Sequence, residues 1–125
     1  MSPKNVSLQS VSPILQVPEM LAALEFYRTV LGFEVAWTWG DPLNHAAVCR
    51  DKVEIMLALA MQEPQPISSI YVVMSGIDDY HASIVKAGGN VTVPLAERPY
   101  GMRDFRVVDP GGNQLSFGEA MVGGG

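Results

Sequence analysis

The chain has 125 residues, which is enough for one domain with a hydrophobic core but too few for two independent domains. Its composition, 48% hydrophobic and 17% charged, is typical of a globular protein and excludes a disordered chain. The net charge of −5, without any basic run, argues against a nucleic-acid-binding surface and is compatible with a cationic small-molecule partner.

The single cysteine and the polar N-terminus indicate the compartment. Cys49 has no second cysteine in the chain with which to form a disulfide, so we expect a reducing environment. The residues after Met1 contain no apolar run long enough for a signal peptide or a membrane helix. We therefore expect a cytoplasmic protein without membrane contact.

The first predicted elements are a strand at 11–17 and a helix over 20–31. Pro13 interrupts the amide donors of the strand, which favours an edge position or a hinge. Gly32 is placed to end the helix as its C-cap. The helix is predicted from one apolar stripe at helical spacing, formed by Met20, Ala23, Leu24, Tyr27, Val30 and Leu31.

Three strands should follow this helix, at 33–39, 45–50 and 53–60. Alternation in the first predicts one shared face, carrying Phe33, Val35, Trp37 and Trp39. The other two read as a hairpin around a two-residue turn, Asp51-Lys52. Such a turn fixes the register and predicts three cross-strand pairs: Cys49 with Glu54, Ala47 with Met56, and His45 with Ala58.

After a linker at 61–67 the same order of elements begins again. The pattern predicts a strand at 69–74, a helix over 77–85 and strands starting at 90, 102 and 114. Ser75 to Asp78 has the character of a capping box. Asp109-Pro110-Gly111-Gly112-Asn113 is a turn that joins the last two strands into a hairpin.

Superposed, residues 14–35 match residues 70–91, so the chain contains an internal repeat of a β-α-β-β-β unit. The units span about 10–60 and 68–119 within a single domain, 1–125. We expect an α+β fold in which each unit forms a half-open sheet. Because a half-sheet leaves an edge unpaired and encloses no ligand by itself, pairing between units or chains is expected.

Several motifs resemble the vicinal-oxygen-chelate superfamily, which contains glyoxalases, bleomycin resistance proteins and extradiol dioxygenases. They are Leu24 to Phe33, the Pro-Tyr-Gly-Met-Arg-Asp-Phe run at 99–105, the turn at 109–113 and Leu115-Ser116-Phe117. The resemblance covers about residues 11–119, and bleomycin resistance proteins are closest in pattern. It implies two βαβββ units around a concave face, paired in a homodimer.

Enzymes of that superfamily hold a divalent metal with His, Gln or Glu at four positions on the concave face. Carried over one at a time, these positions fall on Ser12, Met56, Ser69 and Ser116. None of these residues is a usual ligand for such a metal. We therefore expect no metal, no cofactor and no catalytic residue from the family pattern.

Aromatic side chains stand out as candidates for ligand binding. The resemblance places Trp37 and Tyr100 where bleomycin resistance proteins carry rings in the drug cleft, and flat rings suit stacking on an aromatic ligand. Core packing is the alternative for Trp37 and Trp39, and a surface position is the alternative for His45. The expected ligand-binding set is Trp37, Trp39, His45, Met56, Tyr71, Tyr100 and Met102.

The function that these observations favour is capture of a flat aromatic small molecule, an antibiotic that can be cationic, by a bleomycin-resistance-like homodimer without chemical transformation. One alternative is an enzyme of the superfamily, such as a lyase, thiol transferase or dioxygenase, with a displaced metal site. A non-catalytic interaction or sensor module is the other. Because one fold supports many functions, the site itself has to separate these hypotheses.

Overall fold

The computed structural model describes residues 5–121 and contains eight strands, two α-helices and one π-helical turn among them. In chain order these are β1 (Ile14–Val17), α1 (Met20–Glu25), the π turn η1 (Phe26–Val30), β2 (Glu34–Trp39), β3 (His45–Arg50), β4 (Val53–Leu59), β5 (Ser69–Val73), α2 (Ile77–Lys86), β6 (Asn90–Glu97), β7 (Met102–Val108) and β8 (Gln114–Ala120).

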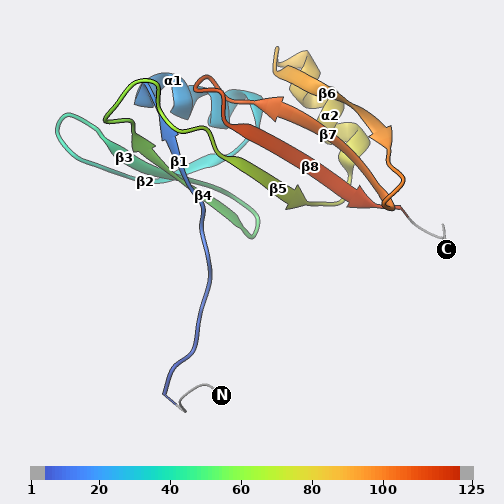
Figure 1. The fold of residues 1–125 in the computed structure, drawn as a ribbon, viewed down its shortest axis with the longest axis horizontal. Coiled ribbons are helices and arrows are strands. Elements are labelled where there is room, and N and C mark those ends of the chain that lie inside the picture. The colour runs from blue at the N-terminus through green and yellow to red at the C-terminus, as the bar shows by residue number, and fades with distance from the viewer. Residues whose placement is uncertain (1–4, 122–125) are drawn as a thin grey trace.

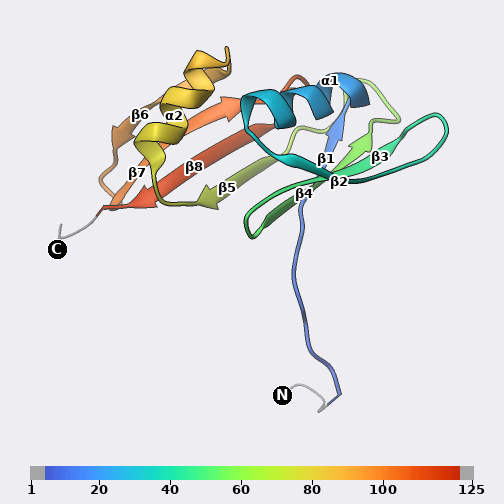
Figure 2. The same cartoon turned by 180° about the vertical axis from the view of Figure 1, so that it is seen from behind.

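The predicted repeat is confirmed by the strand order. Sheet A has the order β1-β4-β3-β2, and sheet B has the equivalent order β5-β8-β7-β6. In sheet A, β1 pairs with β4 in parallel, and in sheet B, β5 pairs with β8 in the same way. Both helices lie on the same side of the molecule (Figures 1 and 2). The chain therefore has the expected α+β fold of two βαβββ units. None of the helices formed by residues 5–121 has the length and apolar character needed to cross a membrane.

Alternation along the strands sends one set of side chains toward the helices and leaves the other set on the opposite face of each sheet, here called the open face. Leu15, Leu57 and Phe105 are among the buried residues on the helix side, and the two units share one hydrophobic cluster. The core thus lies between the helices and both sheets, and the open faces remain uncovered in the single chain.

The two-residue turn of the β3–β4 hairpin is confirmed, and so is its register. Cys49 pairs with Glu54, Ala47 with Met56, and His45 with Ala58. Asp51 adopts a positive φ of 51° at the turn, a conformation that aspartate tolerates better than most residues. Since His45, Ala47 and Met56 share the open face of sheet A, the turn alone determines part of the candidate site.

The prediction that Val35 shares a face of β2 with Trp37 and Trp39 is wrong. A β-bulge between Val35 and Trp37 shifts the register, so that Val35 pairs with Val48 while Trp37 pairs with Ala47. Val48 and Ala47 are consecutive in β3 and point to opposite faces. The extra residue therefore separates Val35 from Trp37, an effect that strict alternation does not anticipate.

Both helices differ from expectation at one end. The first ends in the π turn η1, which starts at Phe26, instead of continuing as a regular α-helix to residue 31. The N-cap of α2 is Gly76 at φ 80°, and no side-chain cap of the predicted kind forms. Instead, the Ile77 amide donates to Glu119 Oε1 over 2.9 Å, so a carboxylate distant in sequence replaces the capping box.

The first strand is shorter than predicted, because regular pairing begins only at Ile14. Residues 5–11 form an extended arm that leaves the body on the side away from the helices (Figure 1), whereas the Pro13 carbonyl still accepts from the Met56 amide over 2.9 Å. Leu8 and Val11 in this arm are 94% and 92% exposed. Two large apolar side chains are thus left without packing partners in the single chain.

Two hydrogen bonds, one of them buried, connect the two units at the turn between β7 and β8. Tyr27 Oη donates to Asp109 Oδ2 over 2.9 Å, and Asn113 Nδ2 donates to the Gln16 carbonyl over 2.9 Å. The other oxygen of Asp109 accepts the amides of Gly111 and Asn113, as expected for an Asx-type turn. The turn therefore joins the units as well as two strands.

Candidate functional site

The predicted site residues are divided between the open faces of the two sheets. Sheet A carries Trp37, Trp39, His45 and Met56, and sheet B and its β6–β7 turn carry Tyr71, Tyr100 and Met102. The two groups come from different units of the repeat. A single chain therefore presents two separate walls rather than one closed site.

The wall on sheet A is aromatic and apolar. Trp37 and Trp39 are 39% and 65% exposed, so neither indole belongs to the core of the single chain. Trp39 and His45 meet edge to face, with their ring centroids 5.9 Å apart, and His45 Nδ1 lies 2.6 Å from Asn44 Oδ1. Half-buried Met56 pairs with buried Ala47 beside Trp37.

A cavity of about 570 Å³ lies beside β1, β4 and β3 of the same sheet. His45 and Gln16 supply polar groups to it, and the remaining lining residues are Ile14, Asn44, Ala58, Leu59, Met61 and Gln62. The volume lies within the range of small-molecule pockets in proteins. His45 lies at this cavity, whereas Trp37 and Trp39 do not line it.

The wall on sheet B is organised around Asp104, which is only 5% exposed. Its Oδ2 accepts hydrogen bonds from Tyr71 Oη at 2.9 Å and Tyr100 Oη at 2.5 Å. Its Oδ1 accepts from Arg98 Nε at 2.8 Å, which is also an ion pair. Nearby in the sheet, Arg106 Nε donates to Ser116 Oγ over 3.2 Å. We call Tyr71, Arg98, Tyr100 and Asp104 the Asp104 cluster.

These contacts set the protonation states of the Asp104 cluster. Desolvation disfavours the Asp104 carboxylate, but hydrogen bonds from Tyr100, Arg98 and Tyr71 outweigh it and hold the pKa of Asp104 below its usual value. Desolvation, followed by the hydrogen bond to Asp104, raises the pKa of Tyr71 to about 12. The hydrogen bond to Asp104 is the largest factor that raises the pKa of Tyr100. At neutral pH both phenols are therefore neutral and Asp104 is ionised.

Tyr71 and Tyr100 were predicted from the sequence as site residues, but Asp104 and Arg98, which organise their hydroxyl groups, were not. Met102, Asp104 and Arg106 alternate along β7, so all three face the open side of sheet B. A charged residue at alternate positions of a strand was the available signal. What the sequence did not show was that Arg98, beyond a turn, returns to the same carboxylate.

The residues at the family's four metal positions do not fit a divalent metal. Ser12 Oγ donates to Glu54 Oε1 over 3.1 Å, and Ser116 accepts from Arg106. Met56 contributes only a thioether, and Ser69 pairs with Gln114 in the sheet. Among residues 5–121, no three His, Cys, Asp or Glu side chains come together as a metal-binding group.

Comparisons with known proteins agree with this architecture. The family model described as Glyoxalase superfamily protein matches residues 2–124. A comparison with curated proteins gives no significant match.

Solved structures of low sequence identity share the fold. TioX from Micromonospora sp. ML1 is 19% identical, with a TM-score of 0.80 over 90% of this chain and 100% of its own. A glyoxalase/bleomycin resistance protein/dioxygenase from Nocardioides is 22% identical, with a TM-score of 0.75 over 97% and 89% of the two chains. Lactoylglutathione lyase from Agrobacterium tumefaciens is 17% identical, with a TM-score of 0.73 over 94% and 98%. At these identities the likeness concerns the fold. Because the family model spans nearly the whole sequence, the chain belongs to the glyoxalase superfamily.

Proposed function

We propose that this protein binds an aromatic small molecule on the open face of sheet A and does not transform it. The observation that carries the proposal is the exposure of Trp37 and Trp39 on one face of the sheet, 39% and 65% in the single chain. Neighbouring exposed indoles on a soluble fold mark a binding surface more often than a packing defect. Their rings offer rigid stacking area for a flat ligand.

The chemistry of the metal positions supports binding over the family's metal-dependent reactions. Ser12, Met56, Ser69 and Ser116 do not supply the imidazole and carboxylate donors that such a metal requires. The Ser12 and Ser116 side chains hydrogen-bond to Glu54 and Arg106, and Met56 presents an apolar side chain beside Ala47. The open face of sheet A is thus better suited to holding an apolar ligand than to activating one.

The Asp104 cluster would form the second wall and fix the orientation of the ligand. Both Tyr71 and Tyr100 donate their hydroxyl protons to Asp104, so their oxygens present only lone pairs to an incoming molecule. Ligands with N–H or O–H groups are favoured there. Arg106 supplies the complementary donors, because its guanidinium has N–H groups beyond the one bonded to Ser116.

Joining the two walls requires a homodimer, which we propose as the functional form. The extended arm at 5–11 exposes Leu8 and Val11, and β1 and β5 each form an edge of their sheet. Edge strands and unpacked apolar arms are features that a second copy of the chain can cover. Sheet A of one subunit would then face sheet B of the other. With its single cysteine, Cys49, free, the protein suits the cytoplasm.

A thermal-shift screen tests this function. The purified protein is heated with aromatic antibiotics, bleomycin among them, and separately with Zn²⁺, Ni²⁺, Mn²⁺ and Fe²⁺. An aromatic compound that binds the native state is expected to raise the melting temperature as its concentration rises. A response to metals alone, together with metal-dependent turnover of a glyoxalase substrate, would favour an enzyme instead.

A further inference from the structure

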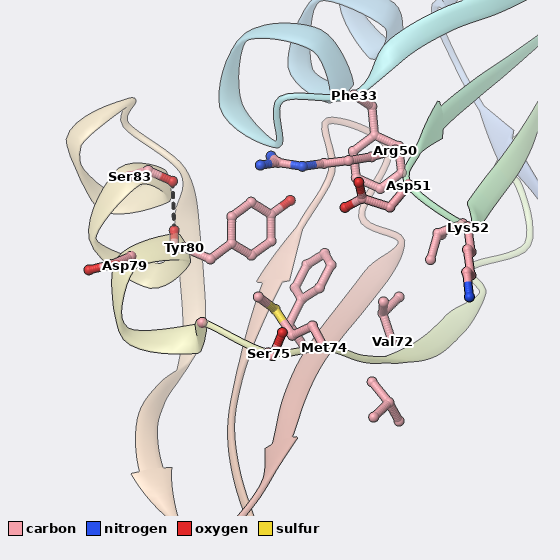
Figure 3. A pocket seen from close by; sticks show the side chains of 14 residues that line it. Phe33, Arg50, Asp51, Lys52, Val72, Met74, Ser75, Asp79, Tyr80 and Ser83 are labelled. Atoms are coloured by element: carbon pink, nitrogen blue, oxygen red, sulfur yellow. Dashed lines mark hydrogen bonds between the residues drawn. The ribbon is translucent and has the colours of Figure 1, made fainter.

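A second cavity, of about 590 Å³, lies where the two units meet, away from both aromatic walls. Its walls come from the tip of the β3–β4 hairpin on one side and from α2 with the segment before it on the other (Figure 3). None of Trp37, Trp39, Tyr71 and Tyr100 lines it. It is therefore distinct from the site of the proposed function.

The floor of this cavity is apolar and belongs to both units. Phe33 comes from the first unit, Phe117 and Val72 come from the second, and Met74 and Tyr80 close the side next to α2. Phe117 packs edge to face on Tyr80, with ring centroids 5.1 Å apart, so this part of the floor is held in one arrangement. A flat ring would find a firm apolar surface here.

A fixed positive charge lies over this floor. Arg50 Nη1 donates to the Leu31 carbonyl over 3.0 Å, and its guanidinium carbon stands 5.0 Å from the centre of the Tyr80 ring. Figure 3 shows the side chain reaching from the hairpin across the cavity toward α2. Tyr80 Oη donates to the same carbonyl over 2.7 Å, which holds the ring beneath the cation.

The other charges at the rim are less constrained than Arg50. Lys52 adds a second cation on the hairpin side, and Asp51 and Asp79 also line the cavity. Within residues 5–121, neither carboxylate takes part in a hydrogen bond or ion pair, and both residues are exposed to solvent. Neither Arg50 nor Lys52 is ion-paired in this part of the chain. The preorganised charge inside the cavity is thus positive.

We propose that this cavity binds a small aromatic carboxylate, with its ring on the Phe117–Tyr80 floor and its carboxylate on Arg50 and Lys52. A guanidinium is suited to a carboxylate because its planar N–H groups match the two oxygens. The volume is sufficient for a ligand of one or two rings. The proposal goes beyond the aromatic-capture function and does not depend on dimerisation.

Calorimetric titration with 2-naphthoate tests the charge preference. The neutral alcohol 2-naphthylmethanol has the same rings and serves as the matched ligand. We expect one 2-naphthoate per chain and binding of the alcohol weaker by about tenfold or more, the size of a charge-assisted hydrogen bond. Equal binding of both compounds, or no 2-naphthoate binding at millimolar concentration, would overturn the proposal.

Variants locate the bound carboxylate. Lys52→Glu alters an exposed side chain and is expected to weaken 2-naphthoate binding several-fold. Lys86→Glu, also exposed but on α2 and outside the cavity, should leave it unchanged. Arg50→Met should weaken binding further, and a melting curve will show whether this variant folds. If it does not fold, the comparison of Lys52→Glu with Lys86→Glu decides. Trp37→Ala should have no effect. Loss of 2-naphthoate binding in Trp37→Ala, with full binding in Lys52→Glu, would place the ligand on the open face and contradict the proposal.

Discussion

Three donors converge on the carboxylate of Asp104, and this convergence determines how the open face of sheet B responds to mutation. Asp104→Asn keeps the shape but removes the charge that Arg98 and the two phenols contact. Hydrogen bonds to a charged group are each worth about 1.5–3 kcal/mol, and the exposure of both tyrosines lets water compensate for part of the loss. We expect the free energy of unfolding at pH 7 to fall by about 2 kcal/mol, as measured by urea denaturation.

The same variant predicts a dependence on pH. Because the pKa of Asp104 is lower in the folded state than its usual value, the stability it contributes is complete above about pH 4 and is lost as the pH falls through the folded-state pKa. The difference in unfolding free energy between the wild type and Asp104→Asn should therefore shrink below pH 4. A difference that stayed constant down to pH 2 would show that the carboxylate is not held in this way.

Gly118 leaves room for the Tyr71 hydroxyl, because a Cβ at this position would overlap it. Gly118→Ala is therefore expected to move Tyr71 away from Asp104 and return the pKa of Tyr71 from about 12 toward the ordinary value of about 10. Ultraviolet titration of the phenol groups measures this shift. The titration curve of Tyr71→Phe is subtracted from that of the wild type to identify the signal of Tyr71. The raised pKa contributes stability below pH 10 that is lost between pH 10 and 12, so the wild type should lose this contribution over that interval and Gly118→Ala should not. An unchanged titration near pH 12 in Gly118→Ala would contradict this geometry.

At the scale of elements, the π turn and the β7–β8 turn meet in one buried hydrogen bond. Tyr27→Phe removes the hydroxyl that reaches Asp109 and leaves a buried oxygen with one partner fewer. We expect a loss of about 1–3 kcal/mol in unfolding free energy. Tyr100→Phe, which removes a hydroxyl from an exposed ring, is the matched control and should cost less. A loss below about 0.5 kcal/mol in Tyr27→Phe, measured by chemical denaturation, would contradict a stabilising role for this hydrogen bond.

The repeat and the β3–β4 register were predictable because they depend on local rules. A two-residue turn such as Asp51-Lys52 fixes its pairs, and helix-terminating glycines recur in both units. The face of Val35 was not predictable, since a bulge is an accommodation between two strands that leaves no mark in alternation. The cap of α2 was not predictable either, because the Glu119 carboxylate that accepts from the Ile77 amide lies in β8, far away in the sequence.

The candidate site also contains parts that local sequence patterns predict and parts that they do not. Trp37, Trp39 and His45 could be assigned to one wall because they follow from periodicity and a turn. The cavity between the units could not be, because it depends on how Arg50 of one unit lies over Tyr80 of the other. Contacts between distant segments are set by packing of the whole core, which no local pattern describes.

At the scale of the whole molecule, the exposed arm predicts self-association. The wild type should sediment as a dimer at roughly 50 micromolar, a concentration at which weak dimers persist. Leu8→Asp combined with Val11→Asp should shift it toward the monomer, because charges replace the apolar side chains that a second copy would cover. Leu21→Asp on α1 also alters an exposed apolar residue, lies outside the arm, and should leave the dimer intact. A monomeric wild type would contradict the dimer.

The most direct test of aromatic capture is the affinity of Trp37→Ala and Tyr100→Ala for bleomycin, measured together with their melting temperatures. Stacking adds about 0.5–1.5 kcal/mol beyond the area it buries, so each change should weaken binding by roughly tenfold. Because the Trp37 ring is exposed in the single chain, Trp37→Ala should cost no more than about 1 kcal/mol of stability. Tyr100→Ala also removes a donor to Asp104 and should cost about 1–2 kcal/mol. Val85→Ala, an exposed position on α2, serves as the control and should change neither quantity. A large drop in melting temperature with unchanged affinity would show that these rings pack the protein and do not bind a ligand.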